Sequence, residues 1–227
     1  MNIEPIAYFR SLFPTKFGIP RQSGIIDELC GSVVFVPKFR NADALRGIEG
    51  FDYLWLIWEF SANGDSGTNW HPTVRPPLLG GNKSLGVFAT RSPFRPNRLG
   101  LSSVRIDRID YETSEGPVIY VRGADLMDGT PIYDIKPYVT YADAHVDARS
   151  GFVDTKEWGG LTVNIPPHLA RSVPSHLLTA LTKVLALDPR PQYHNDADKL
   201  YGLSFGGMNV RFKVQGTMLE VVEVEHI

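Results

Sequence analysis

Three arginines lie within eight residues of one another in the stretch 85–104, which reads LGVFATRSPFRPNRLGLSSV. Pro93 and Pro96 stand between them. Because proline lacks a backbone donor and fixes φ, these prolines exclude a helix or a central strand. The apolar run 87–89 and the apolar segment that starts at residue 99 predict a strand, a stiff loop and a strand. Guanidinium groups on such a loop are suited to bind carboxylates or phosphates, so the stretch predicts an anion-binding surface.

Charge is distributed unevenly along the chain. The whole sequence has 23 Lys and Arg and 25 Asp and Glu, which gives a net charge of −2. Residues 66–106 contain no acidic residue and six basic ones, so this block carries +6 and the remainder −8. Such a local positive field predicts a phosphate or carboxylate partner rather than a merely solvated basic face. The six residues are Arg75, Lys83, Arg91, Arg95, Arg98 and Arg105.

Two further segments carry groups that complement the loop of residues 90–98, which we call the arginine loop. The first is Pro20–Gln22, in a loop bounded by glycine and proline, and the second is the turn Asp128–Thr130. The turn offers backbone amides and a carboxylate for an ammonium group or a ribose hydroxyl, while Arg91 suits a carboxylate. Together they predict a site for a zwitterionic ligand that carries a sugar. The alternative is that Asp128–Thr130 serves only as a turn.

Several classes of enzyme are excluded because their motifs are missing. The sequence contains no H-E-x-x-H and no Walker A motif. No G-x-G-x-x-G follows a predicted strand, which argues against a Rossmann domain. A single cysteine, Cys30, excludes an internal disulfide, and the isolated His71 is poor evidence for a metal. We therefore expect no metal site.

Membrane and export signals are also missing from the sequence. No apolar run approaches the roughly 18 residues of a transmembrane candidate. The N-terminal residues lack the basic and apolar regions of a signal peptide. We expect a cytoplasmic protein that makes no membrane contact.

The first 145 residues have the pattern of a β protein. Segments rich in β-branched and aromatic residues alternate with Gly/Pro turns at regular spacing, and no βαβ alternation is present. We therefore expect a mainly β fold with an N-terminal closed or nearly closed antiparallel β-barrel. The predicted strands are 3–9, 31–36, 51–60, 102–111, 118–122 and 132–135, and residues 41–45 are predicted to form a short helix capped by Asn41.

The last third of the chain has a different pattern. Residues 146–171 are rich in Gly and Pro and predict a linker or an excursion. Apolar spacing over 175–187 predicts a helix that ends at Asp188-Pro189. Alternation over 210–214 and 217–224 around Gln215-Gly216 predicts a hairpin. The expected organisation is a barrel domain at 1–145, a linker or excursion at 146–171 and a small α+β domain at 172–227.

Long motifs run through nearly the whole sequence. They are GVFATRSPFRPN at 86–97 with LGLS at 99–102, TVRPP at 73–77 with LGG at 79–81, DGTP at 128–131 with DIKPY at 134–138, DPRP at 188–191 and NVRF at 209–212. This set resembles the signature of the TsaA-like family, whose best-known members are TrmO-type tRNA methyltransferases. The motifs are long and specific.

The resemblance implies an S-adenosylmethionine-dependent enzyme that acts as a homodimer. In the family it methylates N6 of threonylcarbamoyladenosine beside the anticodon, at position 37 of certain tRNAs. The family usually has histidine at or near position 61, and Asn-Pro where Asn97-Arg98 stands here. The family's cofactor contacts fall on Pro20, Arg21, Gln22, Ser61, Ala62, Arg91, Leu101, Met127, Asp128, Gly129 and Thr130.

The implied reaction places modest demands on the protein's own side chains. The methyl group of S-adenosylmethionine is already activated as a sulfonium, so the enzyme mainly aligns nucleophile, methyl group and sulfur. The N6 of a carbamoylated adenine is a weak nucleophile, and removal of its proton would help. We expect Asp134, Lys136 and Tyr141, with Asp143 near them, to include a base or orienting group. The alternative for each is a structural or surface role.

The basic loop is the predicted contact with the anticodon arm of tRNA. Lys83, Arg95 and Arg98 are expected to bind phosphates, and Phe94 to stack on an exposed base. An alternative function is a non-catalytic S-adenosylmethionine-binding regulatory protein. A third is a methyltransferase of the same fold that acts on a small molecule or a protein. The basic block favours nucleic acid over this third function.

Overall fold

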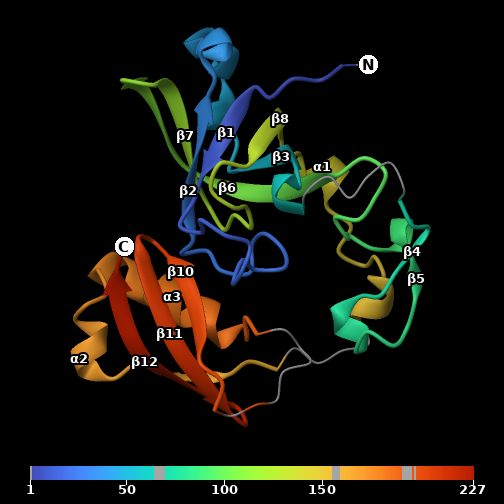
Figure 1. Cartoon of the computed structure of the whole chain (residues 1–227). Coiled ribbons are helices and arrows are strands. Elements are labelled where there is room, and N and C mark those ends of the chain that lie inside the picture. The colour runs from blue at the N-terminus through green and yellow to red at the C-terminus, as the bar shows by residue number, and fades with distance from the viewer. Residues whose placement is uncertain (1, 64–69, 155–158, 191–195, 197) are drawn as a thin grey trace.

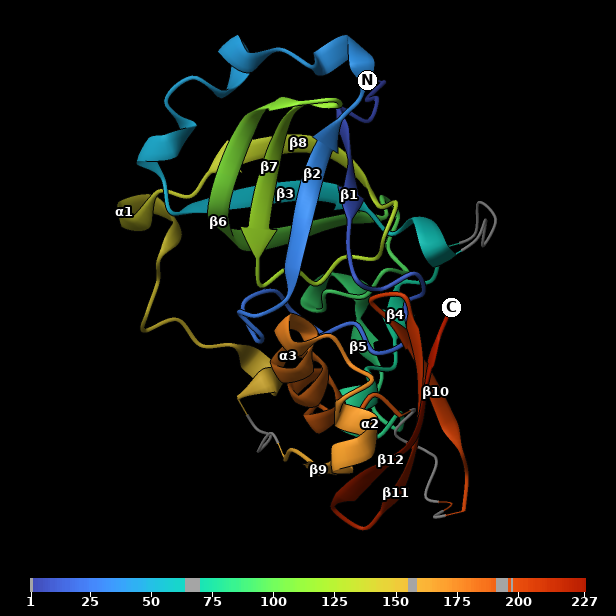
Figure 2. The same cartoon turned by 90° about the vertical axis from the view of Figure 1, so that its left-hand side faces the viewer.

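Six strands close into an antiparallel barrel in this computed structural model (Figures 1 and 2). The hydrogen-bonded order is β1–β2–β7–β6–β3–β8, and β8 returns to β1. The strands are β1 Ala7–Arg10, β2 Cys30–Phe35, β3 Tyr53–Glu59, β6 Leu99–Thr113, β7 Gly116–Arg122 and β8 Pro131–Pro137. The structure describes residues 2–63, 70–154, 159–190, 196 and 198–227. The predicted closed barrel is confirmed.

Apolar side chains from alternate strand positions fill the barrel. On β3, Leu54, Leu56 and Trp58 are buried, and on the neighbouring strand β6 the buried positions include Ser102. This follows from the two-residue period of a strand, which sends successive side chains to opposite faces. Gly100 pairs with Trp58, and a Cβ there would lie 2.3 Å from the indole ring. Glycine therefore lets the indole lie across β6 inside the barrel.

Short 3₁₀ turns connect β2 to β3. They are η1 Pro37–Phe39, η2 Ala42–Leu45 and η3 Ile48–Gly50. The Asn41 side chain accepts a hydrogen bond from the backbone N–H of Asp43 at 2.9 Å, which caps η2. The predicted short helix and its cap are therefore confirmed.

Between β3 and β6 the chain forms an arm beside the barrel (Figure 1). The arm contains η4 Ser61–Asn63, β4 Thr73–Val74, η5 Pro77–Leu79, β5 Leu85–Gly86 and η6 Val87–Ala89. The predicted strand at 87–89 is wrong, because these residues form a 3₁₀ turn and β5 pairs with β4. Both edges of β6 are already paired with β3 and β7, so no edge is left for a hairpin partner.

The C-terminal part is a four-stranded sheet covered by helices. Its strand order is β10–β11–β12–β9, with β9 parallel to β12 and the other pairs antiparallel. The elements of this part are η7 Gly151–Val153, β9 Thr162–Asn164, α2 Pro167–Ala170, α3 Ser175–Ala186, β10 Tyr201–Phe205, β11 Met208–Gln215 and β12 Met218–His226. The short helix α1 Thr140–Asp143 lies beside the barrel instead, where Asp143 accepts a hydrogen bond from Trp55 of β3 (Figure 2). The predicted helix and hairpin are confirmed, whereas β9, α2 and β10 were not predicted.

The connection between β1 and β2 packs into the C-terminal core rather than the barrel core. Phe13, Ile26 and Leu29 are buried in the same cluster as α3 and the C-terminal strands. The Phe13 ring meets the Phe205 ring edge-on at 5.3 Å between centroids. Figures 1 and 2 show this blue connection between the barrel and the C-terminal layer. It joins the two cores. Among the described residues, no helix has the length and apolar character needed to cross a bilayer.

Candidate functional site

The predicted cofactor residues lie mainly on three loops that leave the same end of the barrel, which we call the mouth. These loops are residues 11–29, 60–98 and 123–130. Antiparallel pairing places the end of one strand beside the start of the next, as in the pairs Arg10 with Ser32 and Trp58 with Gly100. The loops also bond to each other, since Gly24 N–H donates to the Gly123 carbonyl at 2.8 Å.

Arg91 and Gln22 meet at the mouth although 69 residues separate them in sequence. Arg91 Nη1 donates a hydrogen bond to Gln22 Oε1. Arg91 is exposed, and a guanidinium has five N–H donors, so the pair leaves further donors for a ligand. The structure therefore brings two of the predicted cofactor segments into direct contact.

Local hydrogen bonds shape the arginine loop. Thr90 Oγ1 donates to the Val87 carbonyl at 2.8 Å and accepts from Ser92 N–H at 3.2 Å. Phe94 N–H donates to Ser92 Oγ at 3.2 Å, and Arg95 Nη1 donates to the Thr90 carbonyl at 3.2 Å. Hydroxyl groups that bond to nearby backbone stabilise turns without a regular element. The loop is thus ordered by its own side chains.

The Asp128–Thr130 turn is anchored to the end of β1. The Asp128 carboxylate accepts from Ser11 N–H at 3.0 Å, and its other oxygen lies 3.9 Å from Arg10 Nη1. Gly129 has φ of +74° and donates its N–H to the Phe9 carbonyl at 2.8 Å. The buried Thr130 hydroxyl donates to the Met127 carbonyl at 2.8 Å. Several of the polar groups that were predicted to bind a ligand therefore make hydrogen bonds that stabilise the turn.

The remaining predicted cofactor residues take varied positions. Pro20 is buried and Arg21 is exposed. Ser61 and Ala62 are exposed on η4, which directly follows β3. Leu101 lies on the outer face of β6, where 55% of it is exposed.

Asp125 is a charged residue of the mouth that the sequence analysis did not single out. Its carboxylate accepts a hydrogen bond from Ser102 Oγ at 2.6 Å, and Ser102 Oγ accepts one from Trp58 Nε1 at 3.0 Å. Burial raises the pKa of Asp125, while Ser102, backbone amides and the charge of Arg91 favour the ionised form. The only sequence signal was an aspartate directly after a strand, which is too common to be specific.

The predicted catalytic residues do not meet the arginine loop within one chain. Asp134 and Lys136 lie on β8, with their charged atoms 3.4 Å apart, and Tyr141 on α1 is 92% exposed. At about 3.3 Å per residue, β8 carries Lys136 roughly 17 Å from Pro131 at the mouth. Asp143 accepts from Trp55 Nε1 at 3.0 Å and caps α1 at Val139 N–H, and these bonds lower its pKa. Catalytic roles for these residues stay predictions.

The predicted RNA-binding residues gather on the arm and the arginine loop. Phe94 is 57% exposed, and the exposed rings of Trp70 and Phe88 lie 5.9 Å apart between centroids. Lys83 is exposed, whereas Arg95 and Arg98 are half-buried. Exposed aromatic rings interleaved with cations suit stacking on unpaired bases.

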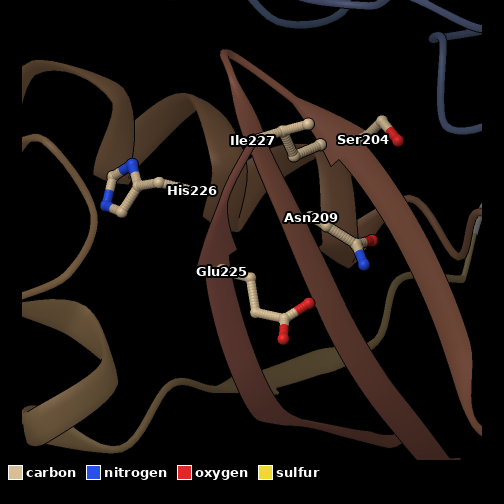
Figure 3. A pocket seen from close by; sticks show the side chains of 5 residues that line it. All are labelled: Ser204, Asn209, Glu225, His226 and Ile227. Carbon is tan, nitrogen blue, oxygen red and sulfur yellow. The ribbon is translucent and has the colours of Figure 1, made fainter.

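Two hollows lie elsewhere on the protein. One of about 800 Å³ is lined by Ser204, Asn209, Glu225, His226 and Ile227. Figure 3 shows that His226 points away from Ser204 and Asn209, and its Nε2 lies 2.9 Å from the Ser172 carbonyl. The other, of about 640 Å³, is lined by Arg149, Gly151 and Asp154. Neither contains a predicted site residue. The described part of the chain holds no group of three potential metal ligands.

The chain forms a β-barrel joined to an α+β unit, and the arginine loop lies at the barrel mouth. This arrangement is that of a known class of tRNA-modifying protein. The family model described as "tRNA-methyltransferase O N-terminal domain" matches residues 8–144, and the model described as "TrmO C-terminal domain" matches residues 163–227. The chain therefore belongs to the tRNA-methyltransferase O family.

Three similar proteins match over almost their full lengths. The Escherichia coli protein named tRNA (adenine(37)-N6)-methyltransferase is 35% identical over 232 residues, covering 99% of this chain and 97% of that protein. An Eikenella corrodens protein of the same name is 40% identical over 176 residues, covering 74% and 93%. A crystal structure of TrmO from Pseudomonas aeruginosa has a TM-score of 0.78 and 31% identity, covering 100% of this chain and 97% of that one.

Proposed function

We propose that this protein transfers a methyl group from S-adenosylmethionine to N6 of threonylcarbamoyladenosine at position 37 of tRNA. The observation that carries the proposal is the contact of Arg91 with Gln22 at the barrel mouth, in a chain of the tRNA-methyltransferase O family. A Pseudomonas aeruginosa relative, 38% identical over 219 residues, is provisionally named as an S-adenosylmethionine-dependent methyltransferase, RcsF.

The residues of the mouth fit the chemical groups of this cofactor. The exposed guanidinium of Arg91 retains donors for an α-carboxylate, because Gln22 occupies only part of its fork. Asp128 Oδ2 faces a single distant cation, Arg10 at 3.9 Å, and suits an ammonium group or a ribose hydroxyl. When bound, S-adenosylmethionine supplies an activated methyl group. The role of these side chains is to bind and orient the reactants.

The arm and the arginine loop are the proposed contacts with the anticodon arm. Lys83, Arg95 and Arg98 supply positive charge for phosphates, and Phe94 supplies a ring for an unpaired base. The methylated adenosine lies in a loop, where unstacked bases are accessible to such side chains. These positions favour an RNA substrate over a small molecule.

Methyl transfer to tRNA separates this proposal from a non-catalytic cofactor-binding regulator. The experiment incubates the purified protein with labelled S-adenosylmethionine and total tRNA from a strain that lacks its gene. We expect label in tRNA, and none when the tRNA comes from a strain that already carries the modification. Tight cofactor binding without label in tRNA would support the regulator and contradict the enzyme.

We also propose that the protein acts as a cytoplasmic homodimer. Apolar side chains remain exposed near the mouth, including Phe88 at 70%, Leu101 at 55% and Leu99 at 38%. Clustered exposed apolar groups mark contact surfaces. Light scattering during size-exclusion chromatography is expected to give twice the monomer mass. The mass of a monomer at micromolar concentration would contradict the dimer.

A further inference from the structure

A buried hydroxyl interrupts the apolar filling of the barrel next to the mouth. Ser102 is 1% exposed and faces the interior from β6. Among the described residues, Ser102 and Thr130 are the polar side chains that are fully buried. Burial of a hydroxyl is unfavourable unless it is hydrogen-bonded, so such a group is retained for a partner.

The partners of Ser102 form a directed chain of hydrogen bonds. Indole N–H can only donate and an ionised carboxylate can only accept, so the bonds run from Trp58 through Ser102 to Asp125. The absence of a side chain at Gly100 lets the indole lie across β6 and reach Ser102. The chain of bonds ends on the carboxylate of Asp125 and fixes its orientation at the mouth.

Two cofactor segments converge on this carboxylate. The backbone beside Ser23 is fixed next to Asp125, because Gly24 N–H donates to the Gly123 carbonyl at 2.8 Å. The Ser23 amide and the positive charge of Arg91 favour the ionised form of the carboxylate. Gln22 and Arg91 are bonded to each other. Asp125 therefore lies close to the segments that carry that pair.

We propose that Asp125 is a positioning residue of the cofactor site, which holds the Pro20–Gln22 loop through Ser23 and keeps Arg91 turned toward the mouth. This inference rests on the proposed function, because it assigns to Arg91 the carboxylate of S-adenosylmethionine. Asp125 itself touches protein groups and acts through Arg91. A negative charge at the barrel mouth keeps the guanidinium in place before the cofactor arrives, and such pre-organisation raises affinity.

Stability and cofactor affinity change in opposite directions if this inference is correct. A half-buried carboxylate carries a desolvation cost, so Asp125→Asn removes a charge while it keeps the shape and the acceptor for Ser102. We expect the unfolding midpoint to stay equal or rise. We expect the affinity for S-adenosylmethionine, measured by calorimetry, to fall about tenfold.

A matched control is available on the outer side of β6. Asp107 accepts from Arg122 Nε at 2.6 Å and lies 3.0 Å from Arg108 Nη1. We expect Asp107→Asn to lower the unfolding midpoint slightly and to leave cofactor affinity unchanged. Ser102→Ala is the second variant: it keeps the charge of Asp125 but loses its orientation, and we expect a several-fold loss of affinity.

A double-mutant cycle between Asp125 and Arg91 decides the mechanism. If Asp125 acts through Arg91, Asp125→Asn causes no further loss of affinity in an Arg91→Ala background. Additive losses would overturn the positioning role, as would unchanged affinity in both Asp125→Asn and Ser102→Ala. If the unmodified protein does not bind S-adenosylmethionine, the proposed function fails and the inference fails with it. If Arg91→Ala weakens cofactor binding while Asp125→Asn and Ser102→Ala do not, the inference fails and the proposed function stands.

Discussion

At the scale of single residues, the pair Arg91 and Gln22 explains how distant motifs form one site. Proline-containing sequence keeps the arginine loop out of regular structure, and the Thr90 and Ser92 hydroxyls order it. Gln22 then holds one side of the guanidinium. The remaining donors form a planar fork that matches a carboxylate.

Removal of this fork is expected to weaken cofactor binding. Arg91→Ala loses hydrogen bonds to a charged group, each worth roughly 1.5–3 kcal/mol, so we expect the dissociation constant to rise about 10- to 100-fold. Arg91→Lys keeps the charge without the fork, so we expect its dissociation constant to lie between those of the native protein and Arg91→Ala. Calorimetric titration with S-adenosylmethionine measures the change. Equal affinities in all three proteins would remove Arg91 from the cofactor site.

The pH dependence of stability reports the burial of Asp125. Because burial raises its pKa above the ordinary 3.8, protonation favours the folded state. The stability of the native protein relative to Asp125→Asn is therefore highest below pH 3.8 and falls as pH rises through the raised pKa. Glu28 and Asp107 have lowered pKa values, so their contributions to stability increase as pH rises. Both residues are present in the native protein and in Asp125→Asn, so these contributions cancel in the difference. Denaturant unfolding from pH 3 to 7 measures the difference, and a constant difference would contradict the raised pKa.

At the scale of elements, the β1–β2 connection couples the cofactor loop to the C-terminal core. Gly18 has φ of +84°, and a Cβ there would lie 2.4 Å from Leu203 Cδ1 on β10. Gly206 N–H donates to the Leu12 carbonyl at 2.8 Å. Both contacts flank Phe13, so the loop that carries Pro20–Gln22 is held by the C-terminal unit.

Loss of the Phe13–Phe205 contact is expected to affect binding as well as stability. Phe205→Ala removes a ring that is 0% exposed, and such truncations cost about 3–5 kcal/mol of unfolding free energy. We also expect weaker S-adenosylmethionine binding in the folded variant at low temperature. Phe212→Ala is the control, because its ring is equally buried but stacks on Tyr201. Loss of affinity in both variants, or in neither, would contradict the coupling.

The strands of the barrel were predictable because residues typical of strands are bounded by turn residues. β3 and β7 combine apolar and β-branched residues with clear turns, and α3 has helical spacing. β9 has only three residues, and its partner β12 lies more than 50 residues away, so local pattern carries little signal for it. Tertiary pairing, rather than propensity, determines such short elements.

The site was only partly predictable from sequence. The Arg91 loop was conspicuous through its prolines and charge, but its contact with Gln22 depends on barrel closure. Asp125 was missed because a hydrogen-bond chain from Trp58 and Ser102, on two other strands, gives it its environment. Motif resemblance predicted the cofactor segments, and it could not show which side chains support them.

At the scale of the whole molecule, the arm lies beside the barrel (Figure 1) and contains two residues of the basic segment, Arg75 and Lys83. The segment with six basic and no acidic residues runs from the arm into β6. Arg105 at its end is paired with Asp27 at 3.3 Å. We therefore expect RNA to contact the arm and the arginine loop rather than the barrel wall.

Salt dependence of tRNA binding tests this distribution of charge. Each phosphate contact contributes about 0.7–0.9 to the slope of log affinity against log salt, so Lys83→Ala is expected to reduce the slope by roughly that amount. Arg46→Ala is the control, because Arg46 is equally exposed but lies on the β2–β3 connection beside Asp43. Fluorescence anisotropy with labelled tRNA at several salt concentrations gives both slopes. A slope for Lys83→Ala equal to that of the native protein would show that Lys83 does not contact the RNA.

Nucleoside mass spectrometry of tRNA tests the central claim most directly. The native protein, S-adenosylmethionine and tRNA from a strain lacking the gene are expected to yield threonylcarbamoyladenosine heavier by one methyl group. Arg91→Ala at the same cofactor concentration is expected to yield much less. Unmethylated threonylcarbamoyladenosine with the native protein, or methylation of a different nucleoside, would contradict the account.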